Sequence, residues 1–295
     1  MKKIWQLGAI ALILGMMAGC NLTSAPPSSL PRVSPKPRVQ KPTTQPPIAS
    51  ATNNRNLLLG NPSNAAPSVA SNIDNYLMVK PQYVLSYNSK TKTANWVSWQ
   101  LNRSWIGAAD RQDNFRPDDA LPTTWYKVRP TDYTGSGYDR GHIAPSADRT
   151  RNEADNSSTF LMTNMMPQVP EVNRGVWGDL EEYCRELVAQ GKELYIIAGP
   201  VGRKGSIGRK EKIAVPARNW KVIVVLDRQG LGMQGIDANT RTIAVIMPND
   251  ASVKGSGWRS FRVSVARVEK ETGLNFLSNL SPQVQQVIES KVDSQ

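Results

Sequence analysis

The 295-residue sequence carries 36 lysines and arginines, 24 aspartates and glutamates and one histidine, for a formal net charge of +12. Residues 1–70 contain seven of the bases and no acid, so residues 71–295 carry 29 bases against 24 acids. A surplus this small does not by itself indicate nucleic-acid binding, because the placement of the bases matters more than their sum. The composition, with two cysteines and one histidine, excludes cysteine zinc sites and multi-histidine metal sites.

Residues 1–20, MKKIWQLGAIALILGMMAGC, combine two lysines, an apolar run and a small-residue end. This pattern predicts a secretory signal, since the segment is too short and wrongly flanked for a membrane-spanning helix. The last four residues look like a lipobox, which precedes the lipidated cysteine of bacterial lipoproteins, although methionine replaces the usual leucine. The alternative is ordinary cleavage near Ala18, with Cys20 left as a free thiol. Both interpretations predict export, and the first anchors the protein to a membrane through Cys20.

Residues 21–70 contain ten of the 21 prolines, no aromatic residue and no acid. Such a segment cannot bury enough apolar surface to offset its ordering entropy, so it is predicted to be a Pro-rich disordered tether. The folded domain is then expected to span residues 71–295, which is long enough for a hydrophobic core.

Six stretches of this domain are rich in β-branched and aromatic residues and are bounded by Gly, Pro, Asn or Asp, as is typical of strands. They are 82–88, 94–101, 159–165, 193–199, 220–227 and 242–248. Strands and helices do not alternate regularly, and no internal repeat is visible. The pattern predicts an α+β domain with flanking helices around a mainly antiparallel central sheet.

The clearest helix is predicted over residues 176–191. Its buried stripe is expected to consist of residues spaced three or four apart, namely Trp177, Leu180, Cys184 and Leu187. Shorter helices are predicted near 265–272 and 282–292, the second with Ser281 as its N-cap and Pro282 at its first position.

The single histidine, His142, lies in GSGYDRGHIAPSADRT, residues 135–150. A histidine can take a proton from water near neutral pH, and Arg140 offers a forked donor suited to phosphate oxygens. Gly141 allows close backbone approach or an unusual backbone angle. The alternative is a core histidine beside a structural Asp139–Arg140 pair. Glycines before the motif and dense charge after it favour a functional site.

A second stretch, TNMMPQVPEVNRGVWGDLEEYCRE at residues 163–186, completes a recognisable pattern. Asp139-Arg140-Gly141-His142, an aliphatic residue, three positions and Ala147 resemble the signature of the DNA/RNA non-specific endonuclease family. Downstream, that family's order and spacing are matched by Thr163, Asn164, Pro167, Gln168, Asn173, Trp177, Leu180 and Glu181. The resemblance covers essentially all of residues 80–292 and looks closest to the sugar-non-specific nucleases of cyanobacteria.

The resemblance implies a ββα-metal (His-Me finger) core, in which a hairpin presents the histidine and a helix presents a metal ligand. It implies that His142 is the general base and that Asn173 is the direct ligand of Mg²⁺, with Mn²⁺ as a possible substitute. Mg²⁺ sheds its bound water reluctantly, so a site with only one or two direct protein ligands suits it. Without that context, Asn173 would be interpreted equally well as a helix N-cap.

The resemblance also assigns Glu181 to the metal site. In a continuous helix the Cα atoms of Asn173 and Glu181 would lie about 12 Å apart, too far to share one ion directly. Either Glu181 acts through a metal-bound water, or Gly175 and Gly178 interrupt the helix. The alternative role of Glu181 is that of a solvent-facing helical acid.

Three arginines are implied in catalysis by the resemblance. Arg111 matches the residue that stabilises the transition state, with Arg116 as a competing assignment, while Arg140 and Arg185 are expected near phosphate. An ordinary i,i+4 ion pair with Glu181 is the competing explanation for Arg185. Asp139 is expected to support the site without binding the metal.

Two further features have open interpretations. The glycine-rich loop 199–212 carries five bases and is either a mobile phosphate-binding loop or merely solvated. Trp177 and Trp220 could stack on bases, but their predicted helix and strand positions favour core packing.

Together these observations predict a secreted or surface-anchored Mg²⁺-dependent endonuclease that hydrolyses DNA and RNA without strong sequence preference. The alternative is a non-catalytic envelope lipoprotein that binds DNA through its basic segments, and a third hypothesis is a phosphodiesterase acting on small esters or chain ends. Some relatives are blocked by a polypeptide inhibitor, so the resemblance adds such an inhibitor as a possible partner.

Overall fold

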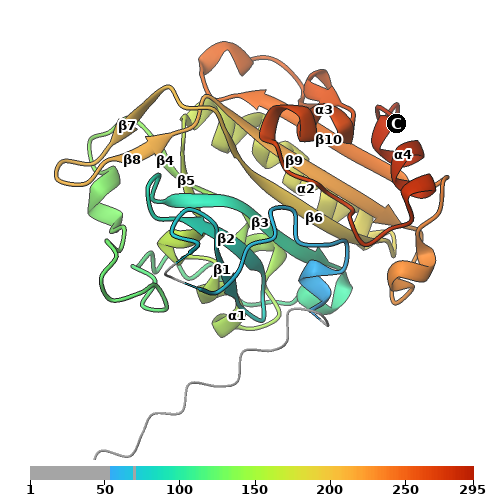
Figure 1. Cartoon of the computed structure of the whole chain (residues 1–295), viewed down its shortest axis with the longest axis horizontal. Helices are drawn as coiled ribbons and strands as arrows, with labels where there is room; N and C mark the ends of the chain where they lie inside the picture. The colour runs from blue at the N-terminus through green and yellow to red at the C-terminus, as the bar shows by residue number, and fades with distance from the viewer. Residues whose placement is uncertain (1–53, 69–70) are drawn as a thin grey trace, which may run out of the picture. The chain divides into compact units, whose positions relative to one another are not determined.

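The computed structural model describes residues 54–68 and 71–295, so the predicted signal, the lipobox and the tether up to residue 53 lie outside the described residues. Within the described residues, seven strands form an antiparallel sheet in the order β1-β2-β3-β6-β9-β10-β11 (Figure 1). The bounds are β1 Tyr76–Val79, β2 Val84–Asn88, β3 Thr93–Leu101, β6 Glu193–Val201, β9 Arg218–Leu226, β10 Arg241–Pro248 and β11 Arg262–Val263. The sheet and its flanking helices confirm the predicted α+β class.

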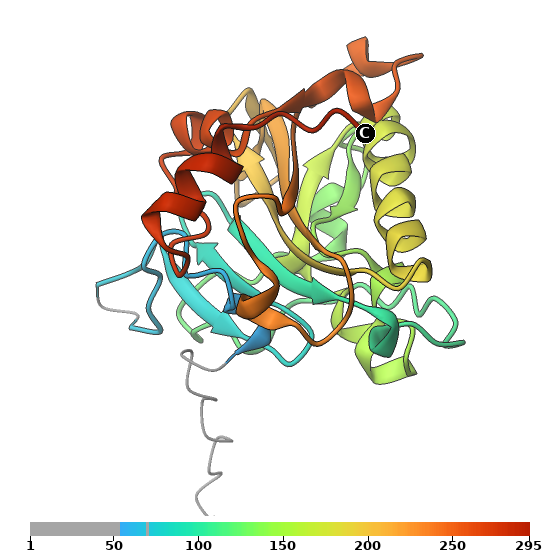
Figure 2. The same ribbon diagram turned by 90° about the vertical axis from the view of Figure 1, so that its right-hand side faces the viewer.

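The helices cover both faces of this sheet. They are α1 Glu153–Ser158, α2 Trp177–Ala189, α3 Val265–Thr272 and α4 Pro282–Ser290. Side chains alternate between the two faces of a strand, so Ile223 of β9 lies in the core beside α2 and Val222 lies in the core beside α3 and α4. Figure 2 shows α2 on one side of the sheet and the two C-terminal helices on the other. No helix in the described residues is long and apolar enough to cross a membrane.

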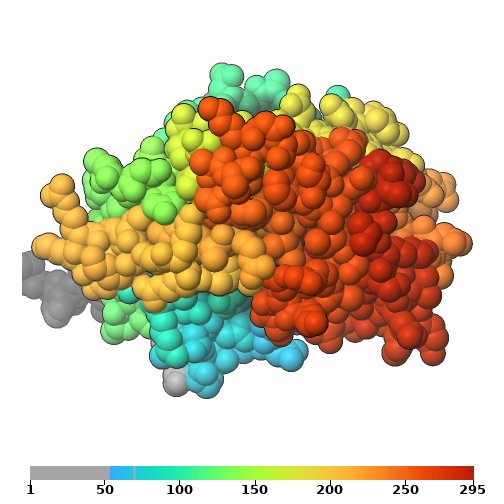
Figure 3. Space-filling model, turned by 90° about the horizontal axis from the view of Figure 1, so that it is seen from above, coloured from blue at the N-terminus to red at the C-terminus, as the bar shows by residue number. Residues whose placement is uncertain are grey.

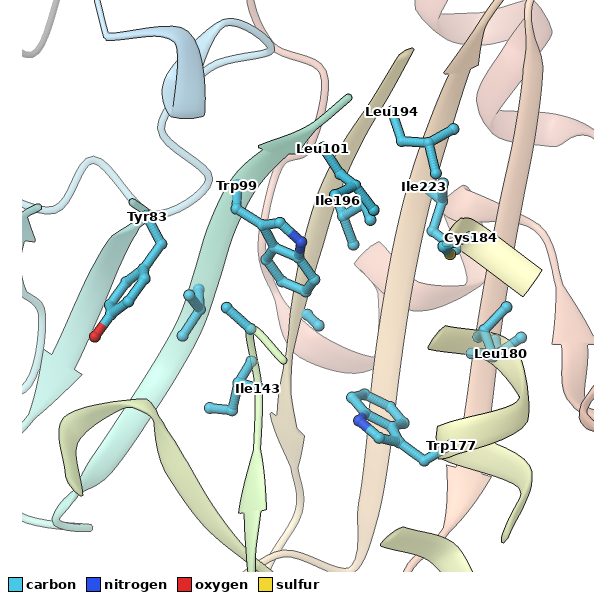
Figure 4. Packing of buried hydrophobic residues seen from close by; sticks show 14 of the residues in the cluster. Tyr83, Trp99, Leu101, Ile143, Trp177, Leu180, Cys184, Leu194, Ile196 and Ile223 are labelled. Atoms are coloured by element: carbon cyan, nitrogen blue, oxygen red, sulfur yellow. The ribbon is translucent and has the colours of Figure 1, made fainter. Parts of the chain in front are cut away.

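The core between α2 and the sheet confirms the predicted buried stripe. Trp177, Leu180 and Cys184 pack in one cluster with Trp99 of β3 and Ile223 (Figure 4). Trp177 is 1% exposed, so it belongs to this core and is not available for stacking on a base. The same holds for Trp220, which is fully buried on the opposite face.

The predicted strand at 159–165 is wrong. Thr159 caps the end of α1, residues 162–164 form a 3₁₀ turn, and only Met165 enters a strand. Asn164 explains the turn, because its side-chain amide donates to the carbonyls of Ala144 and Thr159 and its oxygen accepts from the Ala144 amide. Phe160 and Met162, two of the apolar residues that suggested a strand, are buried in this irregular segment. The helix at 282–292 ends earlier, at Ser290, and Ser281 caps it as expected.

The folded domain begins before residue 71, which corrects the predicted boundary of the tether. Leu57 and Leu59 are buried in the core beside α3 and α4. The side chain of Asn56 accepts from the Gln100 amide and donates to the Pro81 carbonyl, so a 3₁₀ turn at Arg55–Leu57 is fastened to β3. Composition failed here because a few buried leucines anchor a segment that is otherwise polar and proline-rich.

Candidate active site

The motif around His142 forms one strand of a hairpin beside α2. β4 (Asp139–His142) pairs antiparallel with β5 (Met165–Gln168), with His142 opposite Met165. A turn at Val172–Val176 then leads into α2. The order of two paired strands followed by a helix is that of the expected ββα core.

Gly141 is required in β4 because of close approach and not because of its backbone angle. A Cβ atom at this position would lie 1.9 Å from the side-chain oxygen of Gln168, a residue of β5 that pairs with Asp139. A contact that short is impossible, so any larger residue would force the buried side chain of Gln168 to move. The glycine therefore leaves room for the Gln168 side chain beside the strand that carries His142.

His142 lies in an apolar enclosure. The residue is 9% exposed, and its ring packs edge-on against Phe160, with ring centroids 4.9 Å apart, and at a tilt against Phe115, with centroids 5.6 Å apart. Burial, followed by the charges of Arg111 and Arg140, lowers the pKa of His142 to about 3. Nε2 is buried and has no hydrogen-bond partner in the described residues. The imidazole is therefore neutral at physiological pH and able to accept a proton.

Two arginines are held on the same pair of phenylalanines. The guanidinium of Arg111 lies 4.9 Å from the Phe160 ring centre, donating to Ser146 at 2.9 Å, and that of Arg140 lies 4.1 Å from the Phe115 ring centre. Both arginines are exposed. Arg116 instead donates to the Ser157 carbonyl and to Asn114, so of the two competing arginines only Arg111 stands beside His142.

Asp139 organises the helix side of the site. It accepts a hydrogen bond from Asn173 Nδ2 at 2.9 Å and two from Arg174, at 2.7 and 2.8 Å. Burial favours the neutral acid, but these hydrogen bonds outweigh it and lower the pKa of Asp139. Because the amide nitrogen of Asn173 is engaged, its oxygen is left as an acceptor. Asn173 makes no helix-capping hydrogen bond, so the N-cap interpretation is wrong.

The helix is interrupted between Asn173 and Glu181, which is one of the two alternatives expected from the sequence. Gly175 has non-helical angles (φ −109°, ψ −117°), and α2 begins only at Trp177, whereas Gly178 lies within the regular helix. The straight-helix separation of about 12 Å therefore does not apply to this pair.

Glu181 belongs to a buried charged cluster between α2 and the sheet. Its carboxylate lies 3.4 Å from Nζ of Lys221, which is 1% exposed and lies 4.1 Å from the Trp177 ring centre. Burial raises the pKa of Glu181 to about 7, against the effects of Lys221 and Arg185. Its side chain is only 14% exposed, so the solvent-facing interpretation is wrong.

Arg185 completes this cluster without pairing directly with Glu181. Its Nη1 lies 3.3 Å from Asp148, whose carboxylate also accepts from Trp99 at 2.9 Å. Asp148 and Ser146, the partner of Arg111, belong to one 3₁₀ turn after β4. The two clusters are therefore linked by this turn, but they are separate sets of contacts.

A hollow of about 350 Å³ brings most of the expected residues together. Its walls include Arg111, Asp139, Arg140 and Asn173, whereas Glu181 and Arg185 do not line it. His142 adjoins it through Phe115, which is one of the lining residues. A larger hollow of about 550 Å³ beside Tyr183 holds none of the expected catalytic groups.

The donor set suits a metal ion with few protein ligands. The described residues contain no group of three His, Cys, Asp or Glu side chains able to hold a metal. The free oxygen of Asn173 beside the Asp139 carboxylate offers hard oxygen ligands, and such ligands fit an ion that retains most of its water.

Sequence reasoning missed the residues that hold the expected site residues in place. Phe115 and Phe160, two of only four phenylalanines, support His142 and both arginines. Arg174 and Lys221 each pair with an acid of the site. Arg174 could have been noticed beside Asn173, but no local pattern marks Lys221, since its partner is 40 residues away.

Comparison with known proteins relates this chain to a family of nucleases. Residues 60–283 match the sequence profile of the family described as DNA/RNA non-specific endonuclease. A nuclease from Nostoc sp. is 54% identical over 291 residues, which cover 98% of this chain and 98% of the relative. Human mitochondrial endonuclease G is 31% identical over 217 residues, covering 69% of this chain and 70% of that protein.

A solved structure agrees with these sequence matches. It is a crystal structure of the EndoG/EndoGI complex, described as showing the mechanism of EndoG inhibition, with a TM-score of 0.67 and 26% identity. The match covers 82% of this chain and 99% of the solved one.

Proposed function

Since the chain belongs to the DNA/RNA non-specific endonuclease family and is a nucleic-acid-hydrolysing endonuclease, we propose that His142 is its general base and Mg²⁺ its metal ion. It would hydrolyse DNA and RNA without strong sequence preference. The observation that carries this proposal is the buried imidazole of His142, whose Nε2 has no partner in the described residues and whose flanking rings hold two arginines.

His142 takes a proton from the attacking water in this mechanism. Burial and the positive charges of Arg111 and Arg140 keep the ring unprotonated in the free enzyme, so it is available as an acceptor, but they also lower its basicity. An anionic phosphodiester bound beside the ring reverses this bias, since a neighbouring negative charge favours the imidazolium. The basicity of His142 therefore rises when substrate is in place.

Arg111 and Arg140 stabilise the charge that develops on the phosphate. Arg111 engages Asp113 and Ser146 through Nε and Nη1, which leaves Nη2 without a partner in the described residues. Fixed donors of this kind are most effective on charge that appears in the transition state. The aromatic rings beneath the two guanidinium groups keep them at the rim of the hollow.

Asn173, through its side-chain oxygen, would hold the divalent ion directly, and Glu181 would act through a water molecule. Asp139 holds the amide of Asn173 and thereby turns that oxygen away from itself. When bound, Mg²⁺ supplies charge that polarises the phosphodiester and neutralises the leaving 3′ oxygen, and Mn²⁺ can replace it.

Indifference to the sugar follows from the proposed base. His142 activates water and not the 2′-hydroxyl of the substrate, so RNA requires no additional chemistry. The arginines would contact phosphate oxygens and Asn173 would hold the metal ion, and neither contact depends on the base sequence.

The cellular context of this activity is also a proposal. The N-terminal sequence supports export, with an envelope anchor through a lipidated Cys20 or release after cleavage. The complex reported for EndoG concerns inhibition of that protein, which makes a polypeptide inhibitor a reasonable partner to seek here.

The test compares the full chain with its His142→Ala variant on closed-circular plasmid and structured RNA, with Mg²⁺ or EDTA. We expect the wild type to cut both substrates only with metal and the variant to lose about 10²- to 10⁴-fold in turnover, as on removal of a general base. Near-normal turnover of the variant would contradict the role of His142. Binding without cleavage, unaffected by EDTA, would support a non-catalytic DNA-binding protein. Cleavage of the RNA but not of the circular plasmid would indicate an enzyme that acts at chain ends.

A further inference from the structure

The basic loop after β6 is an anchored hairpin that lies beside the active site. β7 (Gly205–Ile207) pairs antiparallel with β8 (Ile213–Val215). The apolar side chains of Ile207 and Ile213 are buried in a cluster with Tyr133 of the hollow and Met165 of β5. The loop is therefore a fixed part of the domain.

Contacts on the opposite side of the hairpin anchor it a second time. The Ala214 amide donates to the Thr91 carbonyl at 2.9 Å, and Glu211 forms an ion pair with Lys92 at 3.2 Å. Glu211 is the one acid among residues 203–212, and Lys92 neutralises it.

The exposed surface of the hairpin is strongly basic. Its bases are Arg203, Lys204, Arg209, Lys210 and Lys212, all of them exposed. Within residues 54–68 and 71–295, none of the five forms an ion pair with an acid. Seen from above, the hairpin projects from the body of the molecule at the left of Figure 3. Unpaired positive charges on a projecting, anchored element are suited to an extended polyanion.

Lys204 connects this surface to the hollow. Its ammonium group lies 5.8 Å from the ring centre of Tyr138, which lines the hollow and directly precedes Asp139. From Lys204, the three residues of β7 extend about 10 Å at the usual rise of a strand. That distance corresponds to roughly three base-pair steps of duplex DNA.

We propose that the β7–β8 hairpin binds the phosphate backbone of the nucleic acid on one side of the bond that is cleaved. The inference rests on the proposed function, because it extends the substrate path outward from the hollow at His142. Contacts of this kind add affinity and salt dependence without reading sequence. The hairpin thus favours long substrates over short ones.

The test is a triple variant of the full chain, Arg209→Ser, Lys210→Ser and Lys212→Ser. Lys204 is left intact because its ammonium group also donates to the Asn249 carbonyl. Binding of a long duplex is measured over a range of salt concentrations in EDTA, where no cleavage is needed. Each phosphate contact contributes about 0.9 to the slope of log K against log salt, so we expect a slope shallower by up to about 2.7. The KM for plasmid should rise about tenfold or more, and by less for a short duplex.

A second triple variant controls for total charge. Arg55→Ser, Arg103→Ser and Arg228→Ser remove the same number of exposed charges from the opposite end of the sheet. We expect it to leave the salt slope nearly unchanged. Equal slopes for the two triples, or an unaltered slope for the hairpin triple, would overturn the proposal. Because binding is measured without metal, a failure of catalysis in the wild type would be recognised separately.

Discussion

The two sides of the site bury ionisable groups in opposite ways. On the β4 side, His142 is enclosed by two phenylalanines, and the neighbouring charges of Arg111 and Arg140 reinforce its neutral state. On the α2 side, Glu181 is also buried, but Lys221 lies 3.4 Å away and opposes the effect of burial. The pKa of His142 falls to about 3, whereas that of Glu181 rises only to about 7.

This difference shows what each side is suited to do. A buried histidine that has no negative charge beside it is neutral, and it can receive a proton once an anionic substrate binds. A carboxylate with a lysine beside it can remain ionised inside the protein at moderate cost in free energy, and its negative charge can then stabilise a nearby cation. Removing the positive charge beside Glu181 should therefore affect stability, whereas opening the phenylalanine enclosure of His142 should affect the pH dependence of activity.

The largest effect is expected from Lys221→Met, which leaves Glu181 buried without its partner. Breaking one member of a buried ion pair costs about 3 kcal/mol or more. The folded-state pKa of Glu181 already exceeds its usual value of 4.5, so stability falls as pH rises through that interval, and the variant extends the fall to higher pH. Denaturant unfolding should therefore show a larger loss at pH 8 than at pH 5.

A double variant checks the cause of this loss. Adding Glu181→Gln to Lys221→Met removes the unpaired charge, so part of the stability at pH 8 should return. A loss that is the same at both pH values, with no recovery in the double variant, would mean that Lys221 contributes packing alone.

A smaller effect is expected from Phe160→Leu, which opens the enclosure of His142. Less burial raises the pKa of His142 toward 6.5 while Arg111 and Arg140 keep their charges. The acid limb of kcat/KM reports ionisations of the free enzyme, so it should move upward by roughly one pH unit.

Phe276→Leu provides a matched control for this substitution. Phe276 is also fully buried, but it packs on Trp220 at the opposite face of the sheet. The two variants should lose comparable stability, and only Phe160→Leu should shift the pH profile. An equal shift in both would assign the effect to general loosening of the fold.

The sequence was sufficient for the parts of the fold and site that local patterns encode. The long strands β3, β6, β9 and β10 and the stripe of α2 follow from periodicity. The family resemblance singled out Asp139 and Asn173, which the fold brings into hydrogen-bond contact. The strand predicted at 159–165 failed because the tertiary contacts of Asn164 override the β propensity of its neighbours. The folded segment before residue 71 was missed for a similar reason, since Leu57 is anchored by residues far along the chain.

The positioning residues of the site escaped prediction because their partners are distant in sequence. Phe160 contacts His142 from the segment between α1 and β5, and Lys221 contacts Glu181 only because β9 lies in the sheet beneath α2. Neither contact leaves a pattern in its own segment. Residue types and spacing thus indicated the chemistry, whereas the electrostatic environment required the structure.

The smallest effect concerns the junction of the two sides, where Arg174 neutralises Asp139 from an exposed position. Asn173 keeps its own hydrogen bond to Asp139, so Arg174→Gln should leave the proposed metal ligand oriented while restoring negative charge beside it. Because Arg174 is exposed and its charge is screened by water, the gain should be modest, with Mn²⁺ bound roughly threefold more tightly. Electron paramagnetic resonance without nucleic acid measures this directly. If Mn²⁺ binding weakened instead, Arg174 would be needed to hold Asp139 and Asn173 in place, and orientation would outweigh charge at this junction.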